Sequence, residues 1–270
     1  TKYLGSQFDI HGGGMDLMFP HHESEIAQST ICNHVAPVRY WMHNNMITID
    51  GKKMGKSYNN YITLTQMFDG SNPVLTKAYH PMVIRFFVLQ THYRSTLDFS
   101  NDALQASEKG LRRLWDAYEA LEKMGQQSAG GAQAGDAAMD EKVLRLVNEF
   151  DEFMNDDFST AKVLANMFEL VPMINSMKDK TIPVTALSAA TFERLLTRFR
   201  LYINDILGLK SVTEADNDRL QGVMQLLIDI RKEAKSRKDF VTSDKIRNQL
   251  TALGILLKDE KDGNTSYTFD

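Results

Sequence analysis

The hexapeptide KKMGKS at residues 52–57 places three lysines and a serine directly after a turn-like Asp-Gly pair. Two ammonium groups in such a loop, Lys53 and Lys56, can neutralise the charge that builds on a triphosphate during displacement, and Ser57 adds a hydroxyl. The Walker pattern G-x-x-x-x-G-K-[ST] is absent, so this is not a P-loop. Taken alone, the hexapeptide favours a solvated surface loop, and a phosphate-binding loop is the second hypothesis.

Three consecutive glycines follow a short apolar run in the stretch FDIHGGGMD. Gly12, Gly13 and Gly14 allow the backbone to turn tightly and to approach a ligand closely, and their N–H groups can cradle a nucleotide or an acyl group. His11 and Asp16 flank the glycines with polar side chains. A tight turn without a ligand uses the same residue types, so these residues alone leave both interpretations open.

His21 and Glu25 are four residues apart, which puts both side chains on one face of a helix. A histidine and a carboxylate at this spacing can supply two ligands to a metal ion. His22 and Glu25, three residues apart, are an alternative pair. Because a zinc site needs about four ligands, a surface ion pair is the simpler interpretation. Cys32, the only cysteine, is expected to be a small buried side chain.

A basic segment lies close to the C-terminus. Residues 231–247 carry seven basic and three acidic side chains, a local charge of +4, whereas the whole chain has a net charge of −4. A helix of this kind can follow the phosphates of a nucleic acid. A solvated helix face is the usual alternative for such a run of charges.

The composition is that of an ordinary globular protein, with 43% hydrophobic and 24% charged residues among 270. This length suits two or three domains. The single cysteine excludes a disulfide framework and indicates a reducing, cytoplasmic setting. No apolar run approaches the roughly 18–20 residues that span a membrane. Because the chain begins at Thr1, beside its richest motifs, we expect it to be part of a longer protein.

Elements with strand character surround the motifs at the N-terminal end. Residues 7–10 are predicted as a short buried strand that leads into the glycines, and residues 21–32 as a helix. Residues 40–49 have strand composition and end at Asp50-Gly51, a typical hairpin turn. The order strand, loop, helix, strand predicts the second half of an α/β domain with a parallel sheet.

The rest of the chain is predicted to be mostly helical. Ser100 is a suitable N-cap for a helix over residues 100–124, in which leucines at 104, 111, 114 and 121 have helical spacing. Residues 125–140 contain four glycines and are expected to form a flexible loop. Further helices are predicted at residues 81–93, 140–154, 159–178 and 188–207. Residues 215–270 predict two helices and a hairpin that turns at Asp262-Gly263.

Together, the stretches FDIHGGGMDLMFPHHESEIAQS, YWMHNNMI and KKMGKS resemble the cysteinyl-tRNA synthetase family of class I aminoacyl-tRNA synthetases. Residues 53–57 match the family's K-M-S-K-S signature, with Gly55 in place of the usual serine, which softens the loop and removes one hydroxyl. DFSTAKVLANMFEL resembles the helical domain of the family, and residues 235–267 resemble its anticodon-binding module, with Tyr267 near the position of a usual tryptophan. The family's H-I-G-H signature is expected upstream of Thr1.

The resemblance implies a partial Rossmann-like α/β catalytic half, followed by a mainly α-helical bundle and a small α+β C-terminal module. Residues 1–50 would be the C-terminal half of the class I catalytic domain, and residues 51–110 the K-M-S-K-S loop with a connecting helical region. Residues 111–210 would be a helical bundle that binds tRNA, with the flexible loop 125–140 inside it. Residues 215–270 would be the anticodon-binding module.

The resemblance also implies an enzyme that ligates cysteine to cysteine tRNA through cysteinyl-adenylate, with ATP, bound to magnesium, as a substrate. Lys53 and Lys56 are the implied catalytic residues. The implied ATP or adenylate pocket consists of His11, Gly12, Gly13, Gly14, Asp16, Lys56 and Ser57. Because the H-I-G-H half is missing, we expect this chain to be inactive alone.

A zinc ion and tRNA are the other implied partners. His21 and Glu25 match two zinc ligands of the family, and two cysteine ligands are expected upstream, so the chain alone should bind zinc weakly or not at all. Which of His21 and His22 faces the metal is left open. The implied anticodon contacts are Lys235, Arg237, Phe240, Asp244 and Asp259. We expect a cytoplasmic monomer without a membrane partner.

Two other functions are compatible with the same motifs. A small-molecule cysteine ligase of related fold would share the glycines and the lysine signature but would not need an anticodon-binding module. A non-catalytic tRNA-binding module would need residues 215–270 but not the lysine loop. Residues 215–270 therefore favour a tRNA partner over a small acceptor.

Overall fold

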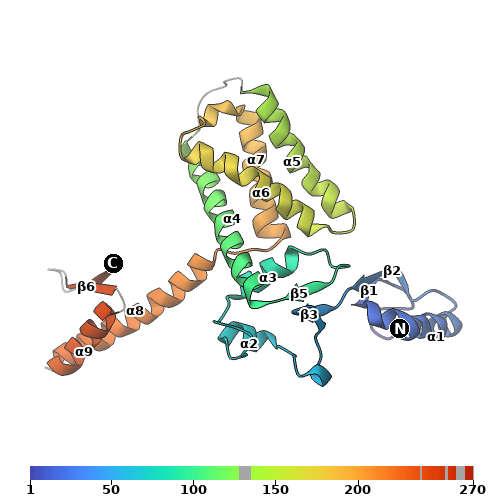
Figure 1. The fold of residues 1–270 in the computed structure, drawn as a ribbon, viewed down its shortest axis with the longest axis horizontal. Coiled ribbons are helices and arrows are strands. Elements are labelled where there is room, and N and C mark those ends of the chain that lie inside the picture. Colours follow the sequence, from blue (N-terminus) through green and yellow to red (C-terminus); the bar gives the residue numbers. More distant parts are fainter. Residues whose placement is uncertain (128–134, 238, 253–254, 260–264, 270) are drawn as a thin grey trace. The chain divides into compact units, whose positions relative to one another are not determined.

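The chain divides into two compact units, Thr1–Lys210 and Ser211–Asp270, in a computed structural model that describes residues 1–127, 135–237, 239–252, 255–259 and 265–269 (Figure 1). The first unit contains two small sheets and most of the helices. The second contains two helices and a hairpin.

Strands β1 (Phe8–Gly14) and β2 (Val38–Asn44) form a two-stranded parallel sheet. The chain crosses from one to the other through two short helical turns, η1 (Met15–Leu17) and η2 (Met18–His22), and helix α1 (Glu23–Asn33). This crossover confirms the predicted strand–helix–strand order. The predicted glycine turn is wrong, because the three glycines continue β1 in extended backbone and pair with the end of β2.

A second sheet has the order β4-β3-β5, formed by β3 (Ile47–Ile49), β4 (Lys52–Lys53) and β5 (Leu97–Phe99). Asp50 and Gly51, with φ of 49° and 75°, make the predicted hairpin turn between β3 and β4. Residues 40–49 form two strands rather than one, because Asn45 leaves the β2 ladder and donates its N–H to the Tyr93 carbonyl oxygen at 2.9 Å.

The remaining helices of the first unit are α2 (Leu64–Asp69), α3 (Pro81–Leu89), α4 (Asn101–Gln127), α5 (Ala137–Asn155), α6 (Thr160–Lys178) and α7 (Ala189–Arg200), which continues into the helical turn η5 (Leu201–Ile206). Among these helices, α4 to α7 lie side by side as a bundle (Figure 1). The four leucines predicted from helical spacing on α4 are 0–1% exposed. Burying one leucine stabilises a fold by roughly 2 kcal/mol, so this stripe contributes strongly to the bundle.

The start of α4 agrees with the predicted boundary, whereas the loop that follows α4 is shorter than predicted. Ser100 Oγ accepts the Ala103 N–H at 3.2 Å at the start of α4, as expected for an N-cap. The predicted loop 125–140 is shorter, because α4 continues to Gln127 and Asp136 caps α5 by accepting the Ala138 N–H at 2.9 Å. Residues 128–134 of that loop lie outside the described residues.

The second unit contains α8 (Val212–Ser236), α9 (Phe240–Ala252) and the antiparallel strands β6 (Ile255–Asp259) and β7 (Thr265–Phe269). This confirms the two predicted helices and the hairpin, whose predicted turn at Asp262-Gly263 lies outside the described residues. Met224, Leu250 and Ile255 form its buried core. No helix in the described ranges has the length and apolar character needed to cross a membrane.

Candidate active site

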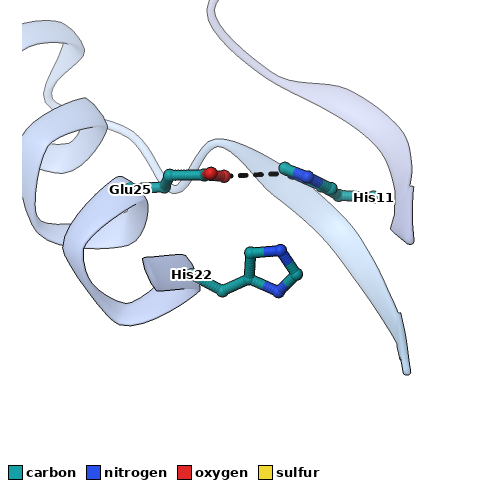
Figure 2. A group of neighbouring side chains, drawn as sticks. All are labelled: His11, His22 and Glu25. Carbon is teal, nitrogen blue, oxygen red and sulfur yellow. Dashed lines mark ion pairs between the residues drawn. The ribbon is translucent and has the colours of Figure 1, made fainter. Parts of the chain in front are cut away.

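Three side chains with metal-binding atoms meet where β1 lies beside the start of α1 (Figure 2). His11 comes from β1, His22 from the end of η2 and Glu25 from the first turn of α1. One potential ligand atom from each lies within 4.8 Å of the others, and His11 Nδ1 is 3.5 Å from Glu25 Oε2. His22 is only 4% exposed, whereas Glu25 is exposed.

Aromatic rings from β2 complete this cluster. The register of the sheet pairs His11 with Trp41 and Gly13 with His43, and residues two apart on a strand share a face. The Trp41 ring stacks on His11 with centroids 4.6 Å apart, and it lies 4.8 Å from the His22 ring. His22 Nδ1 and His43 Nε2 are 2.8 Å apart, within hydrogen-bonding distance. His22 is therefore held on several sides.

The glycines of β1 are needed for space rather than for a turn. A Cβ atom on Gly13 would lie 2.6 Å from His22 Cε1 and 3.2 Å from Leu17 Cδ1. A Cβ atom on Gly14 would collide with the Asp16 carboxylate. A Cβ atom on Gly12 would meet only the Met42 carbonyl oxygen, at 3.7 Å. Gly13 therefore allows the buried histidine to approach the strand. The close approach of a ligand to these glycines stays a prediction.

Two imidazoles and a carboxylate are a donor set that suits zinc, so the residues present fit such an ion. Glu25, one of the two predicted ligands, belongs to this cluster. The structure brings His22 into the cluster, whereas His21 is exposed and makes no part of it. The ligand role of His21 stays a prediction.

The wall of the site differs from expectation at Cys32. This cysteine is exposed rather than buried, and so the prediction was wrong. None of the residues of α1 is buried. It lines an open hollow of about 350 Å³ together with His11 and Glu25. Spacing along a helix could not show which face would be covered.

The lysine loop is held by a hydrogen-bonded framework. Asn60 Oδ1 accepts the Gly55 N–H at 2.9 Å, and Asn60 Nδ2 donates to the Lys53 carbonyl oxygen at 3.0 Å. Lys56 opens the short helical turn η3 (Lys56–Tyr58), and its Nζ lies 5.6 Å from the centre of the Tyr61 ring. Both lysines are exposed, as is Ser57. Within the described ranges, neither lysine forms an ion pair or hydrogen bond with the histidine cluster.

Asp98 on β5 fixes the hairpin turn that precedes the lysines. Its Oδ1 accepts the Thr48 hydroxyl at 2.6 Å and the Gly51 N–H at 2.8 Å. These two hydrogen bonds, from Thr48 first, lower the pKa of the Asp98 carboxyl below its ordinary value. The carboxylate therefore joins β5 to the turn from which Lys53 and Lys56 follow.

Gly55 stands where the K-M-S-K-S signature has a serine, and backbone strain does not explain this difference. Gly55 has φ of −174° and ψ of 152°, an extended conformation that any residue adopts. A Cβ atom there would lie 3.2 Å from the Tyr58 ring, which is 65% exposed and has room to move. A serine is therefore compatible with this position, and glycine here is not required by the local geometry.

The predicted anticodon residues lie in the second unit. Phe240 begins α9 and is 61% exposed, while Lys235, Arg237 and Asp244 are also exposed. Arg237 forms an ion pair with Glu233, one turn earlier on α8. The backbone of Asp259 belongs to β6, but its side chain lies outside the described residues. Their contacts with tRNA stay predictions.

Trp41 and His43 were not among the predicted site residues. Both belong to the stretch YWMHNNMI, on which the family resemblance was partly based. The sequence signal was available in the alternation of β2, since residues 41 and 43 share one face of the sheet, which is also the face of His11 and Gly13 on β1. The pairing of His43 with His22, however, depends on contacts between residues 21 positions apart.

Comparison with known proteins decides the family. Residues 1–109 match the model of the tRNA synthetases class I (C) catalytic domain, and residues 149–211 match the DALR domain. The chain is 51% identical to a cysteine–tRNA ligase of Parabacteroides distasonis and 48% identical to one of Porphyromonas gingivalis, over 97% of this chain and 52% of each relative. The chain belongs to the cysteinyl-tRNA synthetase family. It spans about half the length of the curated relatives it matches.

The fold agrees with this family. A solved LeuRS–tRNA–LeuAMS ternary complex from Agrobacterium radiobacter K84 contains a chain that matches with a TM-score of 0.52 at 16% identity, over 76% of this chain and 27% of that one. At this identity the match concerns the fold alone. Together with the catalytic-domain match it confirms the predicted class, a partial Rossmann-like half followed by a helical bundle and a small α+β module. The predicted domain boundaries stay predictions.

Proposed function

We propose that the full-length protein containing this chain ligates cysteine to cysteine tRNA in an ATP-dependent reaction through cysteinyl-adenylate. The observation that carries this proposal is the identity of about half of the residues, along nearly the whole chain, to relatives named cysteine–tRNA ligase. The grouping of His11, His22 and Glu25, with the lysines of residues 52–57 further along the same unit, supports it. We further propose that the chain alone is inactive, since it has about half of its relatives' length.

The lysines supply charge stabilisation in this reaction. The carboxylate of cysteine attacks the α-phosphate of magnesium-bound ATP in line, and pyrophosphate leaves. Lys56 contacts the phosphates where negative charge develops, and Lys53 supports it. Their exposure and their lack of ion-pair partners in the described ranges leave both ammonium groups available for phosphate. Ser57 adds a hydroxyl to the same turn.

The glycine strand forms the other wall of the adenylate pocket. Gly12, Gly13 and Gly14 present a backbone without side chains, and Asp16 lies close to it. His11 faces the amino-acid end of the adenylate. A surface without Cβ atoms permits a planar ligand to approach the strand closely.

Zinc is the cofactor that this donor set would hold. Glu25, with His21 as the sequence predicts or with His22 as the cluster suggests, would be ligands, and two cysteines from the rest of the protein would complete the set. When bound, zinc would favour a soft thiolate over the hydroxyl of serine. Trp41 and His43 keep His22 in place, so the shape of the site does not depend on the ion alone.

The proposed acceptor is cysteine tRNA. Phe240 is an exposed aromatic ring in a segment rich in basic residues, and this combination can stack on and hold an unpaired base. Lys235, Arg237 and Asp244 lie near it in sequence, and Asp259 is the fifth proposed contact. A monomeric, cytoplasmic enzyme is part of the same proposal.

The decisive experiment measures cysteine-dependent exchange of pyrophosphate into ATP, followed by charging of a cysteine tRNA transcript. The full-length protein should do both, and the 270-residue chain should do neither. Exchange without tRNA charging, but with ligation to an amino-sugar acceptor, would replace the proposal by the small-molecule ligase. Robust exchange by the chain alone would contradict the claim that the other half is essential.

The metal ligands are tested separately. In the full-length protein, bound zinc is measured after the substitutions His21→Ala, His22→Ala and Glu25→Gln, with Gln28→Ala on the same helix as control. Loss with Glu25→Gln and with only one histidine variant identifies the ligand. Retention of zinc in all of the variants would contradict a metal site at this cluster.

A further inference from the structure

The turn between α5 and α6 has an unusual backbone. Asp157 and Phe158, with φ of 61° and 56°, are consecutive non-glycine residues in the left-handed region. Such a conformation persists only where the surroundings hold it. Here the Phe158 N–H donates to the Met154 carbonyl oxygen at 3.1 Å, and the Thr160 hydroxyl donates to the Leu89 carbonyl oxygen at 2.8 Å. The turn is thus tied both to its own helix and to the end of α3.

Asp157 contacts three consecutive residues of another loop, two through its carboxylate and one through its backbone carbonyl oxygen. The Tyr93 hydroxyl donates to Oδ1 at 2.5 Å, Arg94 Nε lies 2.6 Å from Oδ2, and His92 Nε2 is 3.0 Å from the Asp157 carbonyl oxygen. The hydrogen bonds from Tyr93 and Arg94 lower the pKa of Asp157, so it is ionised at neutral pH. We call residues 92–95 the clamp loop. It is fixed from one side by a single carboxylate.

The other side of the clamp loop holds the junction between β2 and β3. Asn45 donates its N–H to the Tyr93 carbonyl oxygen at 2.9 Å, and its Nδ2 donates to the Arg94 carbonyl oxygen at 3.0 Å. The Leu97 N–H donates to the Met46 carbonyl oxygen at 3.2 Å. Thus Tyr93 and Arg94 bind Asp157 through their side chains and Asn45 through their backbone.

Asn45 occupies a critical place in the chain. It lies two residues after His43, which contacts His22, and two before Ile47, where the lysine hairpin begins. We call residues 47–57 the lysine hairpin. An in-line displacement needs the cluster and the lysines at a fixed spacing, and a small misplacement costs much of the rate. The junction at Asn45 sets that spacing along the chain.

We propose that Asp157 is a positioning residue for adenylate formation, because it fixes the clamp loop and thereby the junction from which the lysine hairpin extends. This inference rests on the proposed function. It gives the turn of the helical bundle a part in the chemistry of residues about a hundred positions earlier. It also explains why a strained backbone is retained at Asp157, since a relaxed turn would move the carboxylate away from Tyr93 and Arg94.

The test uses Asp157→Asn, with Asp156→Asn as the matched control. Asp156 is the preceding residue and is exposed, and its carboxylate forms a 3.8 Å ion pair with Lys162. In the full-length protein, Asp157→Asn should lower kcat for cysteine-dependent pyrophosphate exchange by about tenfold or more, while KM for ATP and cysteine changes by less than about twofold. The control should match the unmodified protein in both parameters.

A second measurement separates positioning from folding. In the 270-residue chain, amide hydrogen exchange over residues 45–57 should accelerate in Asp157→Asn but not in Asp156→Asn, with α5 and α6 unchanged. If Asp157→Asn unfolds the bundle, Tyr93→Phe, which removes one hydroxyl, takes its place. Unchanged kcat in Asp157→Asn would overturn the inference, whether or not amide exchange in the hairpin becomes faster. A full-length protein without any exchange activity would instead contradict the proposed function, while the amide measurement would still report on the clamp loop.

Discussion

Replacing Gly13 by alanine adds a single methyl group at the most crowded point of the glycine strand. The new Cβ atom would lie 2.6 Å from His22 Cε1 and 3.1 Å from His22 Nε2, whereas carbon atoms normally approach to about 3.5 Å. A movement of close to 1 Å is therefore needed. His22 cannot yield freely, because it is 4% exposed, lies against Trp41 and contacts His43.

The expected cost follows from these contacts. Overpacking of a dense site costs about 1–3 kcal/mol, and loss of the His22–His43 hydrogen bond costs about 0.5–1.5 kcal/mol. Since both arise from one displacement, we expect Gly13→Ala to destabilise the site by about 1–3 kcal/mol in total. In the full-length protein, adenylate formation should fall by about tenfold or more, since a shift of this size disturbs the placement of the cluster.

Gly12→Ala is the matched control. Its Cβ atom would meet only the Met42 carbonyl oxygen at 3.7 Å, and Gly12 and Gly13 are both in extended backbone. The gain of about 0.4–1 kcal/mol from a stiffer unfolded chain is therefore the same for both variants and cancels in the comparison.

Urea unfolding, followed by the fluorescence of Trp41, measures the difference in stability between Gly13→Ala and Gly12→Ala. A Trp115→Phe background removes the second of the two tryptophans, so that the signal comes from the site. The unfolding midpoint of Gly13→Ala should fall clearly below that of Gly12→Ala. Equal midpoints in the two variants would refute the argument that Gly13 provides room for His22.

Three further outcomes are expected. Lys56→Ala should slow adenylate formation by about 10²–10³-fold in the full-length protein, whereas Lys52→Ala, in the same hairpin, should change the rate by less than about threefold. An unchanged rate in Lys56→Ala would return the loop to the interpretation as a solvated surface. Because the pKa of Asp98 is lowered below the ordinary 3.8, its carboxylate stabilises the hairpin above about pH 4, and this contribution is lost as the pH falls through the folded pKa. The NMR signal of Gly51, which donates to Asp98, should therefore titrate in that range. In Asp98→Asn this titration should disappear. Tyr202→Phe removes a hydroxyl that donates to Asp151 at 2.6 Å and should lower stability by about 1 kcal/mol and Tm by about 2–4 °C, and an unchanged Tm would show that this bond contributes nothing.

Local patterns were sufficient to predict the parts of the fold that depend on neighbours in sequence. The helical spacing of Leu104 and its three partners correctly identified the buried face of α4. The Asp50-Gly51 pair correctly identified a hairpin, because its two left-handed residues are a property of that dipeptide. These predictions needed no knowledge of distant contacts.

The errors arose where a distant residue determines the local conformation. The glycines of β1 are extended because they pair with β2, and Gly13 is needed by His22, nine residues away. The helix predicted to reach residue 93 ends at Leu89, because the residues from His92 onward turn away to contact Asp157. Strand β5 has only three residues and exists through its pairing with β3, about fifty positions earlier. Each of these features depends on the tertiary structure.

The site could be predicted only in part for the same reason. The composition of residues 8–25 indicated a metal or nucleotide site, and Glu25 and His11 do lie together. The choice between His21 and His22 depends on how η2 turns before α1, and two adjacent histidines carry no local signal that distinguishes them. Trp41 and His43 were missed because their importance comes from the face on which they lie.

Strands β1 and β2 should accept substitutions far more readily than changes in length. Their ladder pairs His11 with Trp41 and Gly13 with His43, and these residues share one face while Ile10 and Tyr40 occupy the other. Inserting or deleting one residue within either strand would exchange the two faces, so that an isoleucine or tyrosine replaced an imidazole or an indole. Over the course of divergence, this segment should therefore keep a constant number of residues even where their identities drift.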